Sequence, residues 1–235
     1  EIKAVASENP LIMEKIQVDN EVARLRILKA AHEGKRFALQ DAVTFQYPKR
    51  IQSLEKELQS LQMDLDRRNQ AMEVQPGFAI TLQGKVYEKH KEAGEVLRGI
   101  IEGVTAFTRH EVGMYKGFQV FVQKDMMEPV LFLQGEKEYS VELKSSDSGN
   151  MVRMENRLNA LDKAVEDVQK EIKTCENEIK NAKQEYAKPF PYEELLKENI
   201  TRQMEIDAEL EIKDQEECVE VQEETKNLPC QTAVR

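Results

Sequence analysis

Hydrophobic residues follow a helical period at both ends of this chain and a two-residue period in its middle. The longest pattern advances by alternating steps of three and four residues and comprises Met151, Met154, Leu158, Leu161, Val165, Val168, Ile172, Cys175, Ile179 and Ala182. The same spacing recurs, over a shorter stretch, at Ile51, Leu54, Leu58, Leu61 and Leu65. Such a repeat is the heptad seam of a coiled coil, so two seam-bearing helices are predicted.

Residues 1–75 are predicted to form an N-terminal helical arm. Asn9-Pro10 suits the start of a helix, because proline is favoured at the first helical position. Apolar residues then continue at a looser helical spacing, at Ile16, Val22, Leu25, Leu28, Phe37 and Val43. Tyr47-Pro48 interrupts the pattern, since proline lacks an N–H donor and disfavours helix at its predecessor. The arm is therefore either an αα-hairpin or one long helix kinked at Pro48.

Residues 76–148 have a different pattern of apolar and polar positions. Segments 116–123 and 139–143 alternate between apolar and polar residues, and 130–133 is a short apolar run between them. Segment 78–87 predicts a hairpin that turns at Gly84, and 89–101 predicts a short helix. These signals indicate a small α+β domain with four or five antiparallel strands and one helix.

The C-terminal arm is predicted to span residues 149–212. Lys188-Pro-Phe-Pro191 ends the long seam, and a shorter helix is expected from about 192 to 212. From Asp207 to Glu224 nine acidic residues accompany one lysine. Like charges at this density are typical of disorder, so residues 213–235 are expected to be a disordered acidic tail.

Two seams on either side of a sheet domain predict the architecture. The fold class is α+β: a long antiparallel helical coiled coil built from both arms, with the small antiparallel-sheet domain inserted at its tip. The alternative use of the long seam is a homodimer through the helix at 151–182.

Charge narrows the function. The 235 residues include 34 basic and 44 acidic ones, a net charge of −10, which disfavours a uniformly basic nucleic-acid binder. Of this, −7 lies between Lys188 and Arg235 (13 acidic, 6 basic), so residues 1–187 can still carry a local basic patch. With 33% charged residues, 6% aromatics and no Trp, a large compact enzyme core is not expected.

The apolar runs, the start of the chain and the cysteines indicate where in the cell the protein is expected. No apolar run reaches the roughly 18 residues that span a bilayer, and no secretory signal opens the chain. Three widely spaced cysteines fit neither a disulfide framework nor a zinc site, so a reducing cytoplasm is expected. The first residue is not Met, so we expect a piece of something longer or a processed product.

Motifs for catalysis are missing from the sequence. It contains no Gly-x-x-x-x-Gly-Lys-Ser/Thr loop, no Gly-x-Gly-x-x-Gly fingerprint and no Gly-x-Ser-x-Gly elbow. Its histidines, His32, His90 and His110, do not have metal-ligand spacing. We therefore expect no enzymatic activity, no cofactor and no metal.

One stretch is a candidate contact site. Basic residues interleave with an aromatic one where the predicted hairpin meets the short helix, and basic side chains near a helix N-terminus can hold phosphate. The candidate residues are Lys85, Tyr87, Lys89, His90 and Lys91, with Arg153 as a neighbour.

Several ordered strings resemble a known family. They are Glu1-Ile-Lys-Ala-Val-Ala-Ser-Glu-Asn-Pro-Leu-Ile-Met-Glu-Lys15, Asp19-Asn-Glu-Val-Ala-Arg-Leu-Arg-Ile-Leu-Lys29, Gly84-Lys-Val-Tyr87, Lys91-Glu-Ala-Gly94, Gly113-Met-Tyr-Lys-Gly-Phe118, Gly149-Asn-Met-Val-Arg-Met-Glu-Asn156 and Lys188-Pro-Phe190 with Glu193, Glu194 and Leu195. Together, over about residues 1–212, they resemble the region after the helicase in large SNF2-type helicase and adenine-specific DNA methyltransferase fusions of phages and conjugative elements.

The resemblance implies an accessory region without the family's ATP-binding and methyl-transferring parts. The first hypothesis is therefore a module that contacts nucleic acid, or a nucleic-acid-processing protein complex, through the inserted domain, with Arg153 as its family-matching residue. The second is a mobile-element inhibitor of the anti-CRISPR type that binds a host defence nuclease complex. The acidic C-terminus supports the second hypothesis.

Overall fold

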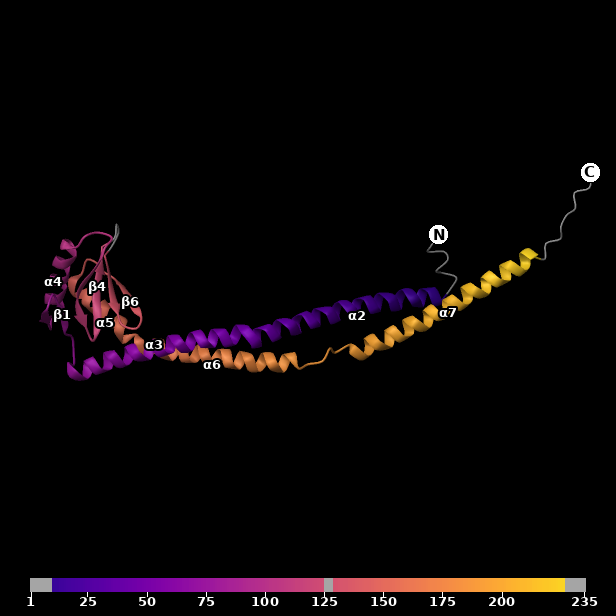
Figure 1. Ribbon diagram of the computed structural model, residues 1–235, viewed down its shortest axis with the longest axis horizontal. Coiled ribbons are helices and arrows are strands. Elements are labelled where there is room, and N and C mark those ends of the chain that lie inside the picture. Colours follow the sequence, from indigo (N-terminus) through magenta and orange to yellow (C-terminus); the bar gives the residue numbers. More distant parts are fainter. Residues whose placement is uncertain (1–9, 125–128, 227–235) are drawn as a thin grey trace, which may run out of the picture. The chain divides into compact units, whose positions relative to one another are not determined.

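The computed structural model describes residues 10–124 and 129–226, and it describes side chains up to residue 212 (Figure 1). The fold is α+β, as predicted, and predominantly helical. The chain divides into two compact units. One contains the described residues within 1–43 and 181–235 and is called the α2–α7 unit. The other contains the described residues within 44–180 and is called the sheet unit.

The α2–α7 unit is built on two long helices that run side by side, α2 (Pro10–Asp41) and α7 (Glu193–Lys226) (Figure 1). Val22 and Leu25 are buried against Leu196. Lys29 pairs with Glu193 at 2.9 Å near one end of the contact. At the other end Arg202 binds Glu14 through two of its nitrogens, at 2.7 and 3.0 Å. Residues later in α2 contact residues earlier in α7, so the two helices are antiparallel.

The C-terminal helix is longer than the sequence predicted. It continues beyond Ile212 to Lys226, so residues 213–226 are helical where a disordered tail was expected. Glutamate, glutamine and lysine have high helix propensity, and no Pro or Gly interrupts this stretch before Pro229. Acidic density therefore does not prevent helix formation here. The last predicted tail residues, 227–235, lie outside the described part of the chain.

The connection between α6 (Leu161–Tyr186) and α7 carries the Lys-Pro-Phe-Pro string, and α6 ends there as predicted. Glu185, near the end of α6, accepts hydrogen bonds from Lys188 and Lys35. These contacts, with the positive charges behind them, lower the pKa of Glu185 from 4.5 to about 2. The ring of Phe190 lies 5.6 Å from that of His32, centroid to centroid.

Of the two forms predicted for the N-terminal arm, the structure has the one long helix, and the αα-hairpin is wrong. A π-helical turn, η1 (Ala42–Gln46), joins α2 to α3 (Tyr47–Val74). Pro48 lies in the first turn of α3. The ring of a proline crowds the carbonyl four residues earlier, and its missing N–H leaves that carbonyl without a donor. A π turn widens the helix locally and accommodates both effects.

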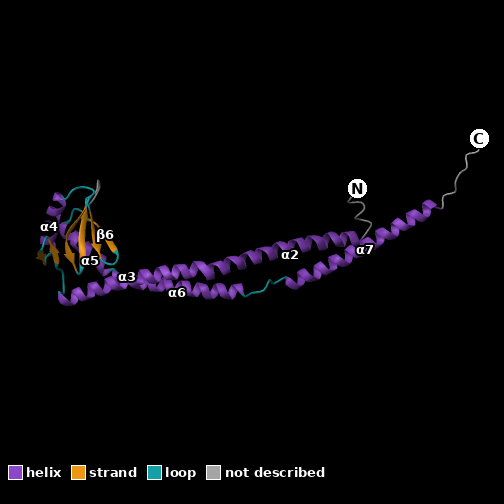
Figure 2. Ribbon diagram, viewed as in Figure 1, coloured by secondary structure: helices purple, strands orange, loops and turns teal. Residues whose placement is uncertain are grey.

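The sheet unit contains one antiparallel sheet of six strands, in the order β2-β1-β3-β4-β5-β6 (Figure 2). The strands are β1 (Ile80–Leu82), β2 (Lys85–Tyr87), β3 (Arg109–Tyr115), β4 (Phe118–Gln123), β5 (Val130–Gln134) and β6 (Glu138–Glu142). Gln83 and Gly84 both have positive φ, 47° and 80°, in the predicted hairpin turn between β1 and β2. The short helix between β2 and β3 is α4 (His90–Gly103).

The strand that the sequence did not predict is β3, which contains a β-bulge between Glu111 and Gly113. Because of the bulge, its buried residues Val112 and Tyr115 are three positions apart rather than two, so strict alternation fails. A Cβ on Gly113 would lie 1.8 Å from the carbonyl oxygen of Thr81 on β1. Only glycine fits at this point of the sheet.

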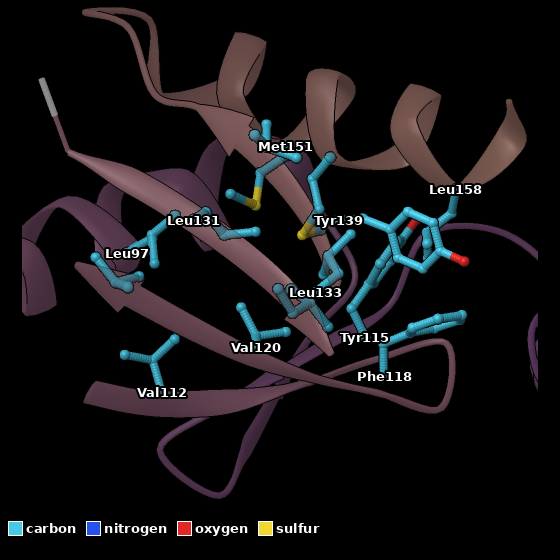
Figure 3. Close-up of a cluster of buried hydrophobic side chains, with 14 of the residues drawn as sticks. Leu97, Val112, Tyr115, Phe118, Val120, Leu131, Leu133, Tyr139, Met151 and Leu158 are labelled. Carbon is cyan, nitrogen blue, oxygen red and sulfur yellow. The ribbon is translucent and has the colours of Figure 1, made fainter. Parts of the chain in front are cut away.

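One face of the sheet is covered by α4 and α5 (Asp147–Asn159). In Figure 3, Leu97 of α4 and Met151 and Leu158 of α5 lie over Leu131 and Leu133 of the sheet. The same core continues into the helices on either side of the sheet in the chain. It includes Leu61 of α3 and Leu161 and Val165 of α6.

The long seam is divided between two helices rather than carried by one. The α-helical pattern is interrupted at Ala160, between α5 and α6. Before the interruption Met151, Met154 and Leu158 pack on the sheet; after it Leu161 packs with α3. These residues are buried within their own chain. A homodimer through 151–182 would require them to leave this core.

Two charged side chains of α3, Asp64 and Arg68, are buried in the sheet unit and join α3 to other elements. Arg68 donates to the Leu158 carbonyl at 2.9 Å and to Asp162 at 2.7 Å, which satisfies the end of α5. Asp64 is fully buried. Its carboxylate accepts hydrogen bonds from four donors, which are the Arg67 guanidinium, the backbone N–H groups of Glu136 and Lys137, and the Tyr139 hydroxyl.

Candidate functional site

Five of the six predicted contact residues lie together at one corner of the sheet unit. Lys85 and Tyr87 are on β2, which is an edge strand. Lys89 precedes the first turn of α4, and His90 and Lys91 lie in that turn. A two-residue passage from β2 to α4 thus gathers the group, as the sequence predicted, and leaves the three lysines exposed.

The lysines at this corner have only weak partners. The Lys85 ammonium lies 5.3 Å from the centroid of the Tyr87 ring. Lys89 pairs with Glu92 at 2.8 Å, and this hydrogen bond and charge raise the pKa of Lys89. No ion pair of Lys91 is found within residues 10–124 and 129–212. Exposed pairs of this kind contribute little, so all three lysines can turn toward an external anion.

His90 is a structural residue as well as a candidate contact. Its ring stacks on Phe78 with 3.9 Å between the centroids and 22° between the planes. Its Nε2 lies 3.1 Å from the Glu155 carboxylate of α5. The side chain is about one-third exposed. His90 therefore joins the start of α4 to α5 and presents only part of its ring to a partner.

Glu155 is the centre of a group that sequence reasoning missed. Besides His90, it faces Lys116 at 3.6 Å, and the Lys116 side chain is only 6% exposed. Burial raises the pKa of the Tyr115 hydroxyl, and the negative charge of Glu155 raises it further. We call His90, Tyr115, Lys116 and Glu155 the Glu155 cluster.

The Glu155 cluster lies where two of the resemblance strings meet. Tyr115 and Lys116 belong to Gly113–Phe118, and Glu155 belongs to Gly149–Asn156. The spacing within either string gives no sign of the contact, because the partners come from a strand turn and a helix almost 40 residues apart. The presence of both resemblance strings in one chain was the only signal in the sequence that could have indicated this contact.

Arg153 contacts residues other than the lysine corner, as we call the exposed group Lys85, Lys89 and Lys91. Its guanidinium donates to the side-chain oxygen of Asn150 at 2.9 Å. Asn150 in turn bridges the backbone N–H and carbonyl of Lys144, both at 2.8 Å. Within the described residues no contact joins Arg153 to Lys85, Lys89 or Lys91. Arg153 is exposed on α5, and because it lies two residues before Glu155 it points to a different face of the helix from the Glu155 cluster.

The charges of the Glu155 cluster compensate one another. Among residues 10–124 and 129–212, no group of three or more His, Cys, Asp or Glu side chains is arranged to hold a metal ion. In the same part of the chain no helix has the length and apolar character needed to cross a membrane.

A groove of about 500 Å³ lies next to the buried end of Lys116. It runs between the end of α3 and the β3–β4 turn, and Val74, Met114 and Gly117 are among its lining residues. Val74 is 87% exposed and Met114 49% exposed, so the groove is open and partly apolar. Such a groove is suited to a side chain or a base edge rather than to an enclosed substrate.

The comparisons with known proteins add no relative. No protein-family model matches the chain, and searches of curated proteins and of solved structures find no match.

Proposed function

We propose that this chain is a non-catalytic accessory module of a mobile-element helicase and methyltransferase, and that it contacts nucleic acid through the lysine corner of the sheet unit. In this proposal the antiparallel pairs α2–α7 and α3–α6 belong to one coiled coil, and the sheet domain is an insertion at its tip. The resemblance strings support the assignment as an accessory module. The α3–α6 contacts around Leu61 and Leu161 support the coiled coil.

The observation that carries the nucleic-acid contact is the exposure of the three lysines beside an uncapped helix start. The N-cap residue of α4, Lys89, makes no side-chain capping hydrogen bond to the first turn. Its N–H groups and the positive end of the helix dipole are therefore available to an anion, next to Lys89 and Lys91. A phosphate at this point would meet both kinds of donor.

A salt titration of nucleic-acid binding tests the proposal. Changing Lys85, Lys89 and Lys91 together to alanine should weaken binding, and the loss should shrink as salt rises. Each lost phosphate contact should reduce the slope of log K against log[salt] by about 0.9 for duplex DNA. The matched control removes the same charge from exposed lysines of α6, namely Lys163, Lys170 and Lys173. Equal effects of the two triple variants would mean that only net charge matters.

The alternative is an inhibitor of the anti-CRISPR type that binds a host nuclease complex. The observation in its favour is the charge of −10, with the acid concentrated toward the C-terminus. A basic nucleic-acid channel would attract such a protein. If the unmodified chain binds neither DNA nor RNA at low salt, this reading gains, and competition with nucleic acid for a nuclease complex becomes its test.

A further inference from the structure

Helix α2 carries two heptad stripes on opposite faces, and among residues 10–124 and 129–212 only one of them has a partner. The partnered stripe includes Val18, Val22 and Leu25 and packs against α7. The second stripe advances by steps of three and four and comprises Met13, Ile16, Asn20, Ala23, Ile27, Ala30, Gly34 and Phe37. Every residue of this second stripe is exposed, including Ile27 at 70% and Phe37 at 71%.

The second stripe has the composition of a helix–helix interface. It contains no charge, although charged residues are frequent elsewhere on α2. At about 100° per residue, Ile27 points roughly 140° away from Val22, so the stripe faces away from α7. Ala23, Ala30 and Gly34 are small, and open space surrounds the position of a Cβ on Gly34. A second helix can therefore approach closely along this face.

We infer that the second stripe binds the α2 helix of a second copy of this chain, parallel and in register. In that arrangement Asn20 meets its own counterpart, and a single Asn at an a position favours a two-stranded, in-register pair. Asp19 and Arg24 flank the stripe five residues apart, at g and e positions, so each Asp19 lies beside the partner's Arg24. Within one chain Asp19 accepts a hydrogen bond from Gln203 at 2.6 Å and Arg24 pairs with Glu21 at 2.6 Å, so the contact between copies adds to these bonds. By symmetry this attraction occurs twice.

Other charges flanking the stripe agree with the parallel register. Arg26 and Glu33 would each lie beside an alanine of the other copy, Ala31 and Ala38, so no like charges meet. The antiparallel register that pairs Ala23 with Ile27 instead brings Asp19 close to Glu33 of the second copy. Charge complementarity thus favours the parallel dimer over this alternative.

The inference also relocates the predicted homodimer. The sequence pointed to the 151–182 seam, but the structure buries the first part of that seam within one chain. The loose apolar spacing noted for residues 16–43 is explained in part by two stripes on one helix. The dimer does not depend on the proposed nucleic-acid contact, since it uses different residues in the other compact unit.

Sedimentation velocity of the full chain at a series of concentrations tests the inference. The unmodified chain should be a dimer. Ile27→Glu places a charge in the stripe of both copies and should raise the dissociation constant on the order of 100-fold. The matched control is Leu28→Glu, which makes the same change at the next residue, 37% exposed and outside the stripe. Circular dichroism should show that both variants remain helical.

Three results would overturn the inference. They are a monomer at all concentrations, equal effects of the two glutamate variants, and a dimer that Ile27→Glu leaves intact. The parallel register has its own test, in which Asn20→Cys is oxidised in a Cys218→Ser, Cys230→Ser background. A parallel pair should form a disulfide between identical positions, whereas Leu28→Cys should not. Failure of Asn20→Cys to crosslink in a persisting dimer would exclude this register.

Discussion

The buried carboxylate of Asp64 should be essential to the stability of the sheet unit, and Asp64→Asn isolates its contribution. One oxygen accepts from the Glu136 N–H at 2.7 Å and from Arg67 at 2.9 Å. The other accepts from the Lys137 N–H at 2.9 Å and the Tyr139 hydroxyl at 2.8 Å. Asparagine keeps the shape of the side chain but replaces one oxygen with an NH₂ group. Whichever way the amide turns, its NH₂ group faces a backbone N–H with which it cannot pair, that of Glu136 or that of Lys137.

The magnitude follows from how many buried donors lose their acceptor. A buried polar group left unpaired costs about 1–3 kcal/mol. The Arg67 side chain is 32% exposed and can regain water, whereas Tyr139 is buried and cannot. We therefore expect Asp64→Asn to lower the free energy of unfolding by about 2–4 kcal/mol. For a chain of this size that corresponds to roughly 5–15 °C in melting temperature.

Urea denaturation and amide hydrogen exchange would measure the effect. One of the two amides, that of Glu136 or that of Lys137, should exchange much faster in the variant, because the NH₂ group takes the place of its acceptor oxygen. Asp66→Asn is the matched control, since this neighbouring carboxylate is exposed and its loss should change stability by no more than about 0.5 kcal/mol. If Asp64→Asn is as stable as Asp66→Asn, with both amides still protected, the hydrogen bonds to Asp64 do not hold the β5–β6 hairpin.

Three further predictions concern other parts of the fold. Gly113→Ala should destabilise the sheet unit by about 1–3 kcal/mol in urea, because its methyl group would displace the β1 backbone, whereas Gly99→Ala in α4, with open space around it, should stabilise by up to about 1 kcal/mol. Leu161→Glu buries an unpaired charge at a site 2% exposed, so helicity and melting temperature should fall; an unchanged melt would show that the site is not packed. Glu185 should titrate near pH 2 by NMR, so the stabilisation from its two lysine partners is present above pH 4.5 and is lost as the pH falls toward 2; a midpoint of 4.5 would contradict the pairing.

The periodic parts of the fold were predictable from the sequence because each of them buries one face, so that its apolar residues recur at a regular spacing. The β1–β2 hairpin, β4, β6 and the end of α6 all follow from local pattern and turn chemistry. The bulge in β3 was not predictable, since one extra residue cancels the alternation that identifies a strand. The division of the long seam at Ala160 was hidden for a different reason. An apolar stripe on a helix can pack against a sheet or against another helix, so its spacing does not show which of the two covers it.

The candidate site shows the same limit. The lysine corner is contiguous in sequence, so the spacing of its residues sufficed to find it. The Glu155 cluster depends on a contact between a strand turn and a helix, and no local pattern encodes it. Arg153 was placed with the lysines as a basic neighbour and as a residue that matches the resemblance, and its hydrogen bond to Asn150 associates it instead with the start of α5. Long-range pairing of charged groups is therefore the part that only the structure supplied.

The continuity of one hydrophobic core through α3, the sheet and α6 has a consequence for how this region can be inherited. Recombination that exchanged only residues 76–148 would separate Leu133 and Tyr139 from Leu61 and Leu161, which share their core. It would also leave Asp64 without the hairpin that it binds. The smallest segment that could move between proteins as a working whole is therefore about residues 44–180, with its flanking helices attached. Chimeras cut at the edges of the sheet should be insoluble, and those cut within the helices should fold.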